Sequence, residues 1–216
     1  MNIEQARFNM VEQQIRPWDV LDPEILDLLF VVRREDFVPE AWRTLAFADL
    51  EVPIGQGQVM LSPKMEARML QELAIRKTDR ALEIGTGSGY VAALLGRLAA
   101  SVVTVESNPT LAQAAKVRLA AQGADNVRVV EGDGAQDWAD GAPFDVILVS
   151  GGLPQAPQGL LERLADGGRL LAVVGDAPVM RATLFTKTAD GIRSAVVLET
   201  VVPLLNNPRQ PERFTF

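Results

Sequence analysis

The stretch with the clearest chemical potential is a glycine-rich string, Glu83-Ile84-Gly85-Thr86-Gly87-Ser88-Gly89-Tyr90. It follows an apolar run over 81–84 that predicts a β-strand, and it precedes a run over 90–98 that predicts a helix. Glycines permit a tight turn and a close approach of a ligand to the backbone, and the start of a helix offers free N–H donors. This strand-turn-helix context predicts a ligand-binding loop.

The spacing of the three glycines indicates which ligand the loop binds. A dinucleotide site follows the pattern G-x-G-x-x-G/A, whereas here the third glycine, Gly89, comes one position early and is followed by Tyr90. A bulky tyrosine is poorly suited to the close helix packing and the pyrophosphate approach of a dinucleotide fold. The pattern therefore predicts a ligand without phosphates, such as S-adenosylmethionine, and leaves a nucleotide-linked dehydrogenase as an outside alternative.

Two carboxylates follow the next two predicted strands. Glu106 ends the apolar run that begins at position 102, where it can accept hydrogen bonds from both ribose hydroxyls of an adenosine. Asp133, in the triplet Gly132-Asp133-Gly134, follows the run over 127–130 and can accept a hydrogen bond from an adenine amino group. Ligands of open α/β sheets bind at the carboxyl ends of the strands, so we expect these carboxylates to flank one adenosine.

Short apolar runs alternate with helical stretches and provide the elements that position these residues. The predicted strands lie at 81–84, 102–105, 127–130, 146–149 and 170–174. Such alternation is typical of a parallel sheet with crossover helices. Two β-rich segments at 182–188 and 192–204, joined at Asp190-Gly191, predict a hairpin. The predicted fold class is α/β: a Rossmann-like doubly wound, mostly parallel sheet with a C-terminal antiparallel hairpin and an N-terminal helical cap.

The residues before the sheet are predicted to be mainly helical. An apolar stripe over 3–15 predicts one helix, and Asp22-Pro23 supplies an N-cap and a first-turn proline for the next. The segment over 53–57, rich in proline and glycine, predicts a loop, and Ser62-Pro63 caps a further helix. A helix over 160–164 is expected to end at Gly167-Gly168.

Composition restricts the chemistry open to this chain. Its 216 residues include no cysteine and no histidine, which excludes thiol nucleophiles, Cys/His zinc sites, Ser-His-Asp triads and a histidine base. We expect no metal. Acidic residues outnumber basic ones 28 to 21, for a net charge of −7, which disfavours nucleic-acid partners.

Length and hydropathy predict the organisation of the chain and its location. The length fits a single domain over 1–216, which we divide into a helical N-terminal cap with an active-site loop at 1–78 and a Rossmann-like core at 79–216. No signal-peptide pattern and no bilayer-length apolar run is visible. We therefore expect a cytoplasmic protein with no membrane partner.

The glycine string, the segment Val52-Pro53-Ile54-Gly55-Gln56-Gly57-Gln58 and the triplet around Asp133 together resemble the protein-L-isoaspartate O-methyltransferase family. The resemblance runs from about Met10 to Leu204. It implies transfer of a methyl group from S-adenosylmethionine to the α-carboxylate of an L-isoaspartyl residue in a damaged protein or peptide. The ester then collapses to a succinimide that can reopen as aspartate. A carboxylate is ionised near pH 7, so this reaction needs no general base.

The motifs and the resemblance together imply a set of site residues. The expected cofactor-binding residues are Met60, Leu61, Gly85, Thr86, Gly87, Ser88, Gly89, Tyr90, Glu106, Ser107, Asp133 and Gly134. The expected substrate residues are Gln58, Val59 and Ser150.

The active-site loop departs from the family pattern. The family reads Gly-Gln-Thr-Ile-Ser-x-Pro with a catalytic serine, whereas Val59 stands here at the threonine position and Leu61 at the serine position. Both hydroxyl donors are gone, and a hydrogen bond to a charged carboxylate contributes about 1.5–3 kcal/mol. Ser62 is the nearest remaining hydroxyl and the catalytic candidate, with a helix N-cap as its alternative role. A second departure is Ser150-Gly151-Gly152, where the family shows Thr-Ala-Ala.

Three hypotheses remain open at this point. The first is an isoaspartyl methyltransferase with an altered loop. The second is a family member that acts on another acceptor, such as a small carboxylic acid, because residues 59–61 suit a less polar pocket. The third is an S-adenosylmethionine-binding protein without catalysis. The sequence does not determine the oligomeric state or the role of the tail over 206–216.

Overall fold

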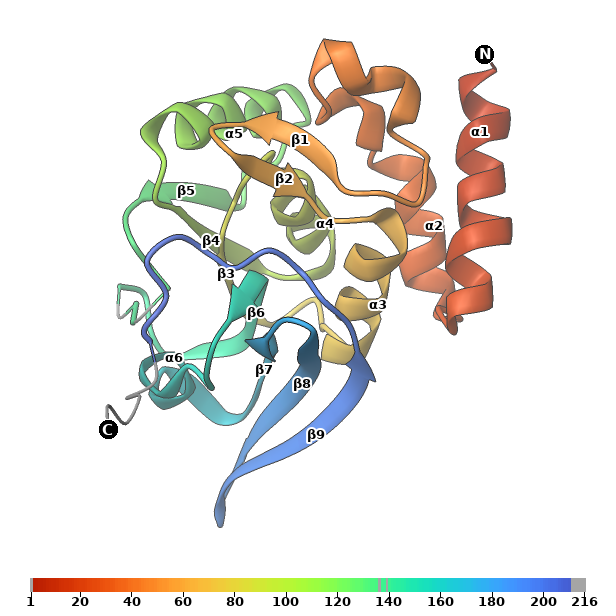
Figure 1. Ribbon diagram of the computed structural model, residues 1–216. Helices are drawn as coiled ribbons and strands as arrows, with labels where there is room; N and C mark the ends of the chain where they lie inside the picture. The colour runs from red at the N-terminus through yellow and green to blue at the C-terminus, as the bar shows by residue number, and fades with distance from the viewer. Residues whose placement is uncertain (1, 136, 139, 211–216) are drawn as a thin grey trace.

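A mixed β-sheet with helices on its faces forms the centre of the molecule (Figure 1). The computed structural model describes residues 2–135, 137–138 and 140–210. Within these residues the sheet has seven strands, in the spatial order β5-β4-β3-β6-β7-β8-β9. They are β3 (Arg80–Ile84), β4 (Ser101–Glu106), β5 (Val127–Glu131), β6 (Phe144–Leu153), β7 (Leu164–Asp176), β8 (Val179–Thr188) and β9 (Gly191–Glu199).

Strands β3 to β7 run parallel, and β8 and β9 add an antiparallel hairpin, which confirms the predicted fold class. Ile84 pairs with Val105 on one side and with Val149 on the other. The carboxyl ends of β3, β4 and β6 are therefore level, and the segments that follow them meet at one edge of the sheet.

Two predicted boundaries near the C-terminus were wrong. Strand β9 ends at Glu199 rather than at position 204, and beyond it Leu204 forms only an isolated parallel bridge with Gly152 of β6. Helix α6 (Gln158–Glu162) ends before Gly167-Gly168, which lie inside β7. Apolar patterning extends beyond both elements because the flanking residues are buried by tertiary contacts: Val202 is only 5% exposed although it belongs to no strand.

The N-terminal segment is helical, as predicted, but its first helix is divided. It comprises α1 (Ile3–Asn9), the π-helix η1 (Met10–Ile15), the 3-10 helices η2 (Arg16–Trp18), η3 (Arg34–Asp36) and η4 (Glu40–Leu45), and the helices α2 (Pro23–Val31) and α3 (Pro63–Leu73). Asp22 caps α2 by accepting a hydrogen bond from the Glu24 amide at 2.9 Å. Helix α3 contacts η1, α2 and β7, so it joins the N-terminal helices to the sheet.

The predicted loop over 53–57 is in fact part of a β-hairpin. Strands β1 (Val52–Gly55) and β2 (Gln58–Met60) pair antiparallel. Gly55, Gln56 and Gly57 have φ angles of 90°, 57° and 71°, and this left-handed backbone turns the chain between the two strands. The glycines signalled the turn correctly, but the strands are too short for a recognisable alternation.

The sheet separates two apolar clusters, because successive strand residues point to opposite faces. On β3, Ala81 belongs to the cluster that includes α3, α4 (Tyr90–Leu98) and α5 (Pro109–Ala121), whereas Leu82 belongs to the cluster that includes α6. Met10 and Leu29 of the N-terminal helices join the first cluster. The N-terminal segment thus shares its core with one face of the sheet, while the division of the chain at position 78 stays a prediction.

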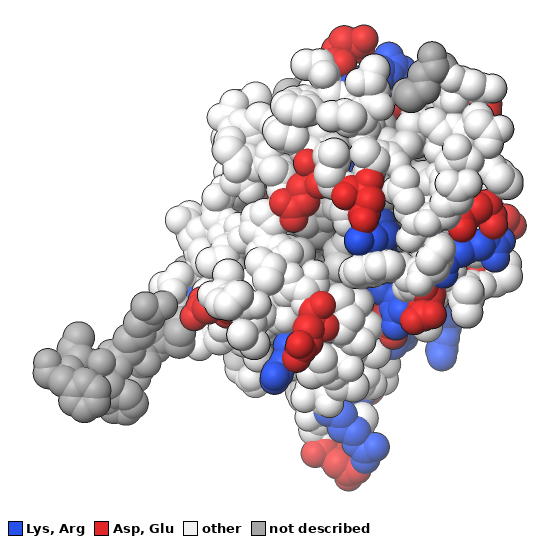
Figure 2. Space-filling view, turned by 45° about the vertical axis from the view of Figure 1, so that its right-hand side comes forward, with Lys and Arg blue, Asp and Glu red and all other residues white. Residues whose placement is uncertain are grey.

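The surface carries charges of both signs. On the face drawn in Figure 2, acidic and basic side chains lie in small mixed groups, rather than in a continuous basic area. In the part of the chain that the structure describes, no helix combines the length and apolar character needed to cross a membrane.

Candidate active site

The glycine loop between β3 and α4 adopts a backbone that other residues rarely accept. Gly85, Gly87 and Gly89 have φ angles of 94°, 52° and 89°. The amide of Gly85 donates to the Val105 carbonyl at 2.9 Å, which ties the loop to β4. A Cβ on Gly89 would lie 3.3 Å from the Cβ of Ala115, so this glycine also lets α4 approach α5 closely.

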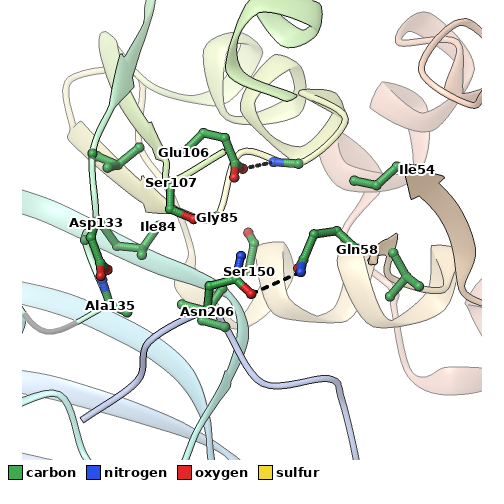
Figure 3. A pocket seen from close by; sticks show the side chains of 16 residues that line it. Ile54, Gln58, Ile84, Gly85, Glu106, Ser107, Asp133, Ala135, Ser150 and Asn206 are labelled. Atoms are coloured by element: carbon green, nitrogen blue, oxygen red, sulfur yellow. Dashed lines mark hydrogen bonds between the residues drawn. The ribbon is translucent and has the colours of Figure 1, made fainter. Parts of the chain in front are cut away.

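Glu106 stands at the end of β4 with its carboxylate held by the backbone. Its Oε2 accepts a hydrogen bond from the Gly87 amide at 2.8 Å (Figure 3). Its Oε1 accepts one from the Asn108 amide at 2.9 Å. Each oxygen retains a further lone pair. Glu106 is therefore oriented before any ligand arrives. Asp133, after β5, is exposed, and it accepts a hydrogen bond from the Ala135 amide at 3.1 Å.

One pocket at the carboxyl edge of the sheet brings together most of the predicted site residues (Figure 3). From the predicted cofactor and substrate sets it is lined by Gly85, Gly87, Glu106, Ser107, Asp133, Gly134, Gln58, Val59 and Ser150. An adjoining hollow shares part of this lining and adds Met60, Leu61, Thr86 and Ser88. Members of both predicted sets thus line each of the two adjoining hollows, and their division into cofactor and substrate residues stays a prediction.

Three predicted residues lie elsewhere. Gly89 and Tyr90 line neither hollow, and Tyr90 is only 1% exposed. The Tyr90 ring packs edge-on against Phe37, with 5.4 Å between the ring centroids. Ser62 is the N-cap residue of α3 but its side chain makes no capping hydrogen bond, and it lines a different hollow beside Trp18. The structure therefore does not bring Ser62 together with Ser150.

A buried carboxyl group lies behind Ser150. Glu83 of β3 is fully buried and accepts hydrogen bonds from Ser150 Oγ at 2.8 Å and from Thr104 Oγ1 at 2.6 Å. Burial raises the pKa of Glu83 to about 8, and the charges of Glu106 and Glu66 act in the same direction, whereas the two hydroxyl donors oppose the rise. Glu83 therefore carries a proton through most of the neutral range, in a network of hydroxyl groups that opens onto the pocket.

A buried ion pair supports the active-site loop from behind. Arg34, 1% exposed, pairs with Glu66 of α3 and donates to the Leu61 carbonyl at 2.6 Å and to the Ala46 carbonyl at 2.9 Å. Burial raises the pKa of Glu66, and the Arg34 guanidinium opposes that rise. The Leu61 carbonyl is thus anchored from inside the protein, and the Leu61 side chain belongs to the apolar core at only 6% exposure.

Part of the pocket lining was not predicted from the sequence. Ile54, Ile84, Val105, Gly132, Ala135, Leu205 and Asn206 also line it. Leu205 and Asn206 come from the segment after β9, where Leu205 donates its amide to the Gly152 carbonyl at 2.9 Å. Asn206 Oδ1 accepts a hydrogen bond from Gln58 Nε2 at 3.2 Å. In the sequence, the feature that could have indicated this segment is the Gly151-Gly152 pair. Its glycine at position 151 leaves room for Leu205, a residue far away in the chain.

Comparisons with known proteins agree with this geometry. The family model for protein-L-isoaspartate(D-aspartate) O-methyltransferase matches residues 5–207. Protein-L-isoaspartate O-methyltransferase 1 of Rhodopseudomonas palustris (strain HaA2) is similar to this chain, with 43% identity over 204 residues, or 93% of this chain and 83% of that protein.

Two solved structures share the fold. One, a protein-L-isoaspartate O-methyltransferase, has a TM-score of 0.80 at 25% identity and covers 95% of this chain and 66% of its own. The other, from Plasmodium falciparum in complex with S-adenosyl-L-homocysteine, has a TM-score of 0.79 at 19% identity and covers 95% and 99%. The family is one of S-adenosylmethionine-dependent enzymes. With nearly its whole length matched, this chain belongs to the protein-L-isoaspartate(D-aspartate) O-methyltransferase family.

Proposed function

We propose that this chain methylates the carboxylate of L-isoaspartyl residues in proteins or peptides, and that donor and acceptor meet in the pocket at the carboxyl edge of the sheet. The observation that carries the proposal is the junction of two half-sites. The glycine loop and Glu106 form one half, and Gln58, Val59 and Ser150 form the other, within one continuous lining.

The first half fits S-adenosylmethionine. The glycine loop exposes backbone without side chains, and a Cβ on Gly87 would lie 3.1 Å from Ile54 Cδ1 and narrow the pocket. Glu106 would hold the ribose hydroxyls with the lone pairs that its backbone donors leave free. Asp133 would receive the adenine amino group. When bound, S-adenosylmethionine supplies a methyl group that is already activated on a sulfonium.

The second half has to align a carboxylate and exclude water. The acceptor is ionised near pH 7, so the protein needs to remove no proton, and orientation supplies the rate. Val59 and the packed Leu61 side chain form an apolar wall that excludes water. Ser150 Oγ donates to Glu83 when that carboxylate is ionised. A protonated Glu83 can reverse this hydrogen bond and donate to Ser150 Oγ, which leaves the hydroxyl proton of Ser150 free for the acceptor carboxylate.

One observation favours a second candidate, methylation of a small carboxylic acid. The positions of Val59 and Leu61 lack hydroxyl groups, and with Met60 they give the adjoining hollow one apolar side. Such a pocket suits a less polar acceptor. Loss of catalysis with retained donor binding is the remaining outcome to be tested. The cytoplasmic location expected from the sequence stays a prediction.

A methyl-transfer assay with labelled S-adenosylmethionine tests the proposal. The acceptors are an isoaspartyl peptide, its aspartyl twin and a set of small carboxylic acids, and calorimetry with S-adenosylhomocysteine measures donor-site binding separately. We expect base-labile methylation of the isoaspartyl peptide alone. Binding of S-adenosylhomocysteine without transfer to the peptide would overturn the proposal, and transfer to a small acid would then support the second candidate.

A Leu61→Ser variant runs in parallel and restores the hydroxyl of the family pattern. We expect it to raise the rate on the isoaspartyl peptide by about tenfold to a hundredfold, because one hydrogen bond to a charged group is worth about 1.5–3 kcal/mol. The variant serves as a positive control for the peptide and for the assay.

A further inference from the structure

Residues 202–206, which we call the strap, cross the carboxyl edge of the sheet after β9 (Figure 1). The strap is attached to the end of β6. The Gly152 amide donates to the Pro203 carbonyl at 2.8 Å, and the Leu205 amide donates to the Gly152 carbonyl at 2.9 Å. These bonds fix the register of the strap and place Leu205 and Asn206 on the wall of the pocket.

The Leu205 side chain packs closely against Gly151 and Gly85, in a space that we call the seat of Leu205. A Cβ on Gly151 would lie 2.6 Å from Leu205 Cδ2 and 2.9 Å from its Cγ, and a Cβ on Gly85 would lie 3.0 Å from the same Cδ2. Gly151 does not have a left-handed φ, so its glycine is required for space rather than for conformation. The Gly151-Gly152 pair, which stands where the family pattern has Ala-Ala, lets the strap lie this close to the pocket.

Asn206 is held at the pocket by a second contact. Its Oδ1 accepts the hydrogen bond from Gln58 Nε2 of the β1–β2 hairpin, and Figure 3 shows these side chains facing each other beside Ser150. An amide that accepts through its oxygen presents its nitrogen elsewhere. Asn206 is an exposed residue, and among the described residues its Nδ2 has no hydrogen-bond partner.

The hydrogen-bond donors that could bind an acceptor carboxylate in this half of the pocket are neutral groups. None of the described residues that line the two hollows is a lysine or an arginine. Val59 and Leu61 offer no donor, and Ser150 can offer a single hydroxyl proton while Glu83 is protonated. The side-chain amides of Gln58 and Asn206 are the further donors on this side of the pocket.

We propose that Asn206 binds the acceptor carboxylate through its Nδ2, as a strap-borne replacement for the hydroxyls that positions 59 and 61 lack. The assignment rests on the proposed function. Gln58 sets the orientation of the Asn206 amide, and the seat of Leu205 sets its position. Acceptor binding in this chain is thus shared between the hairpin and the strap.

Two substitutions of Asn206 separate binding from structure. Asn206→Ala removes the donor, whereas Asn206→Asp keeps the shape and the oxygen that accepts from Gln58 but adds a negative charge. We expect the KM for the isoaspartyl peptide to rise about tenfold to a hundredfold in Asn206→Ala and further in Asn206→Asp, with kcat nearly unchanged. Gln113→Ala, which removes an exposed amide from α5, is the matched control and should leave KM unchanged.

Binding supplies a readout that does not depend on turnover. Calorimetry of the isoaspartyl peptide against protein saturated with S-adenosylhomocysteine should show the same order of Kd, with S-adenosylhomocysteine affinity equal in all variants. Unchanged peptide Kd and KM, or a milder effect of Asn206→Asp than of Asn206→Ala, would overturn the assignment and leave the proposed function standing. A natural protein that neither binds nor methylates the peptide overturns the proposed function itself.

Discussion

The two halves of the pocket are built in different ways. The half assigned to the methyl donor consists of loops that directly follow β3, β4 and β5, and the Gly87–Glu106 hydrogen bond joins residues only 19 positions apart. The half assigned to the acceptor joins the hairpin to the strap, and its Gln58–Asn206 hydrogen bond spans 148 positions.

This difference matches where the chain keeps and where it departs from the family pattern. In the donor half, the backbone conformation of the glycine loop shapes the site. The left-handed φ angles of Gly85 and Gly87 leave little freedom to change residue type. In the acceptor half, side chains bind the ligand, and a donor on another segment that reaches the same space can replace a lost hydroxyl. Substitutions should therefore affect the two halves separately.

The largest effect is expected from Glu106→Ala, which should break the donor half alone. Loss of its hydrogen bonds to two ribose hydroxyls, at about 1.5–3 kcal/mol each, should weaken S-adenosylhomocysteine binding at least a hundredfold. Calorimetry measures this directly. Glu131→Ala removes an exposed carboxylate at the end of the neighbouring strand and is the control. Equal affinity in the Glu106→Ala and Glu131→Ala proteins would refute the role of Glu106.

An intermediate effect is expected from Gly151→Ala, which should disturb the acceptor half alone. The new Cβ collides with Leu205 and displaces the strap, so kcat/KM for the isoaspartyl peptide should fall about tenfold while S-adenosylhomocysteine affinity changes little. Adding Leu205→Ala should recover part of the loss, because the double variant removes the collision while it also removes the side chain that positions Asn206. Additive losses in the double variant would contradict this seat for Leu205.

A smaller effect concerns the pH dependence of the acceptor half, which contacts Glu83 through Ser150. As pH rises through about 8, Glu83 ionises and draws the Ser150 proton away from the acceptor, so the KM for the peptide should rise several-fold. A Glu83→Gln variant should show a flat profile. A step in KM near pH 8 that survives in this variant would assign the titration to another group.

The same carboxyl group should make stability depend on pH. Its pKa of about 8 in the folded protein lies above the ordinary 4.5, so its contribution to the free energy of unfolding is complete below about pH 4.5 and is lost as pH rises through about 8. Denaturant unfolding of the natural protein and Glu83→Gln between pH 6 and 9 measures this. The difference in stability should shift in favour of the glutamine variant as pH rises.

The smallest effect is expected from Ser62→Ala. Ser62 makes no capping hydrogen bond and lines a hollow apart from the pocket, so both kcat/KM and stability should stay close to those of the natural protein. Steady-state kinetics and thermal unfolding check both quantities. A loss of activity beyond tenfold with unchanged stability would restore Ser62 as a catalytic candidate.

The sequence by itself predicted the features that depend on neighbouring residues. Strands β3 to β7, the helix from Tyr90 to Leu98, the glycine loop and the place of Glu106 all follow from apolar periodicity and from glycine at positions that turn the chain. These signals are local, because burial on one side of an element and a left-handed φ are properties of short segments. The absence of histidine and cysteine likewise restricts the chemistry, because it depends on composition alone.

Tertiary structure alone decided which distant segments share the acceptor half. The β1–β2 hairpin, the strap and the seat of Leu205 depend on contacts between residues far apart in the chain, and periodicity carries no information on such pairings. The motif that contains Tyr90 suggested a ligand contact, yet the side chain turns into the core against Phe37, because the first turn of α4 faces the N-terminal helices. Close packing between non-neighbouring segments, rather than local propensity, determined the acceptor side of this site.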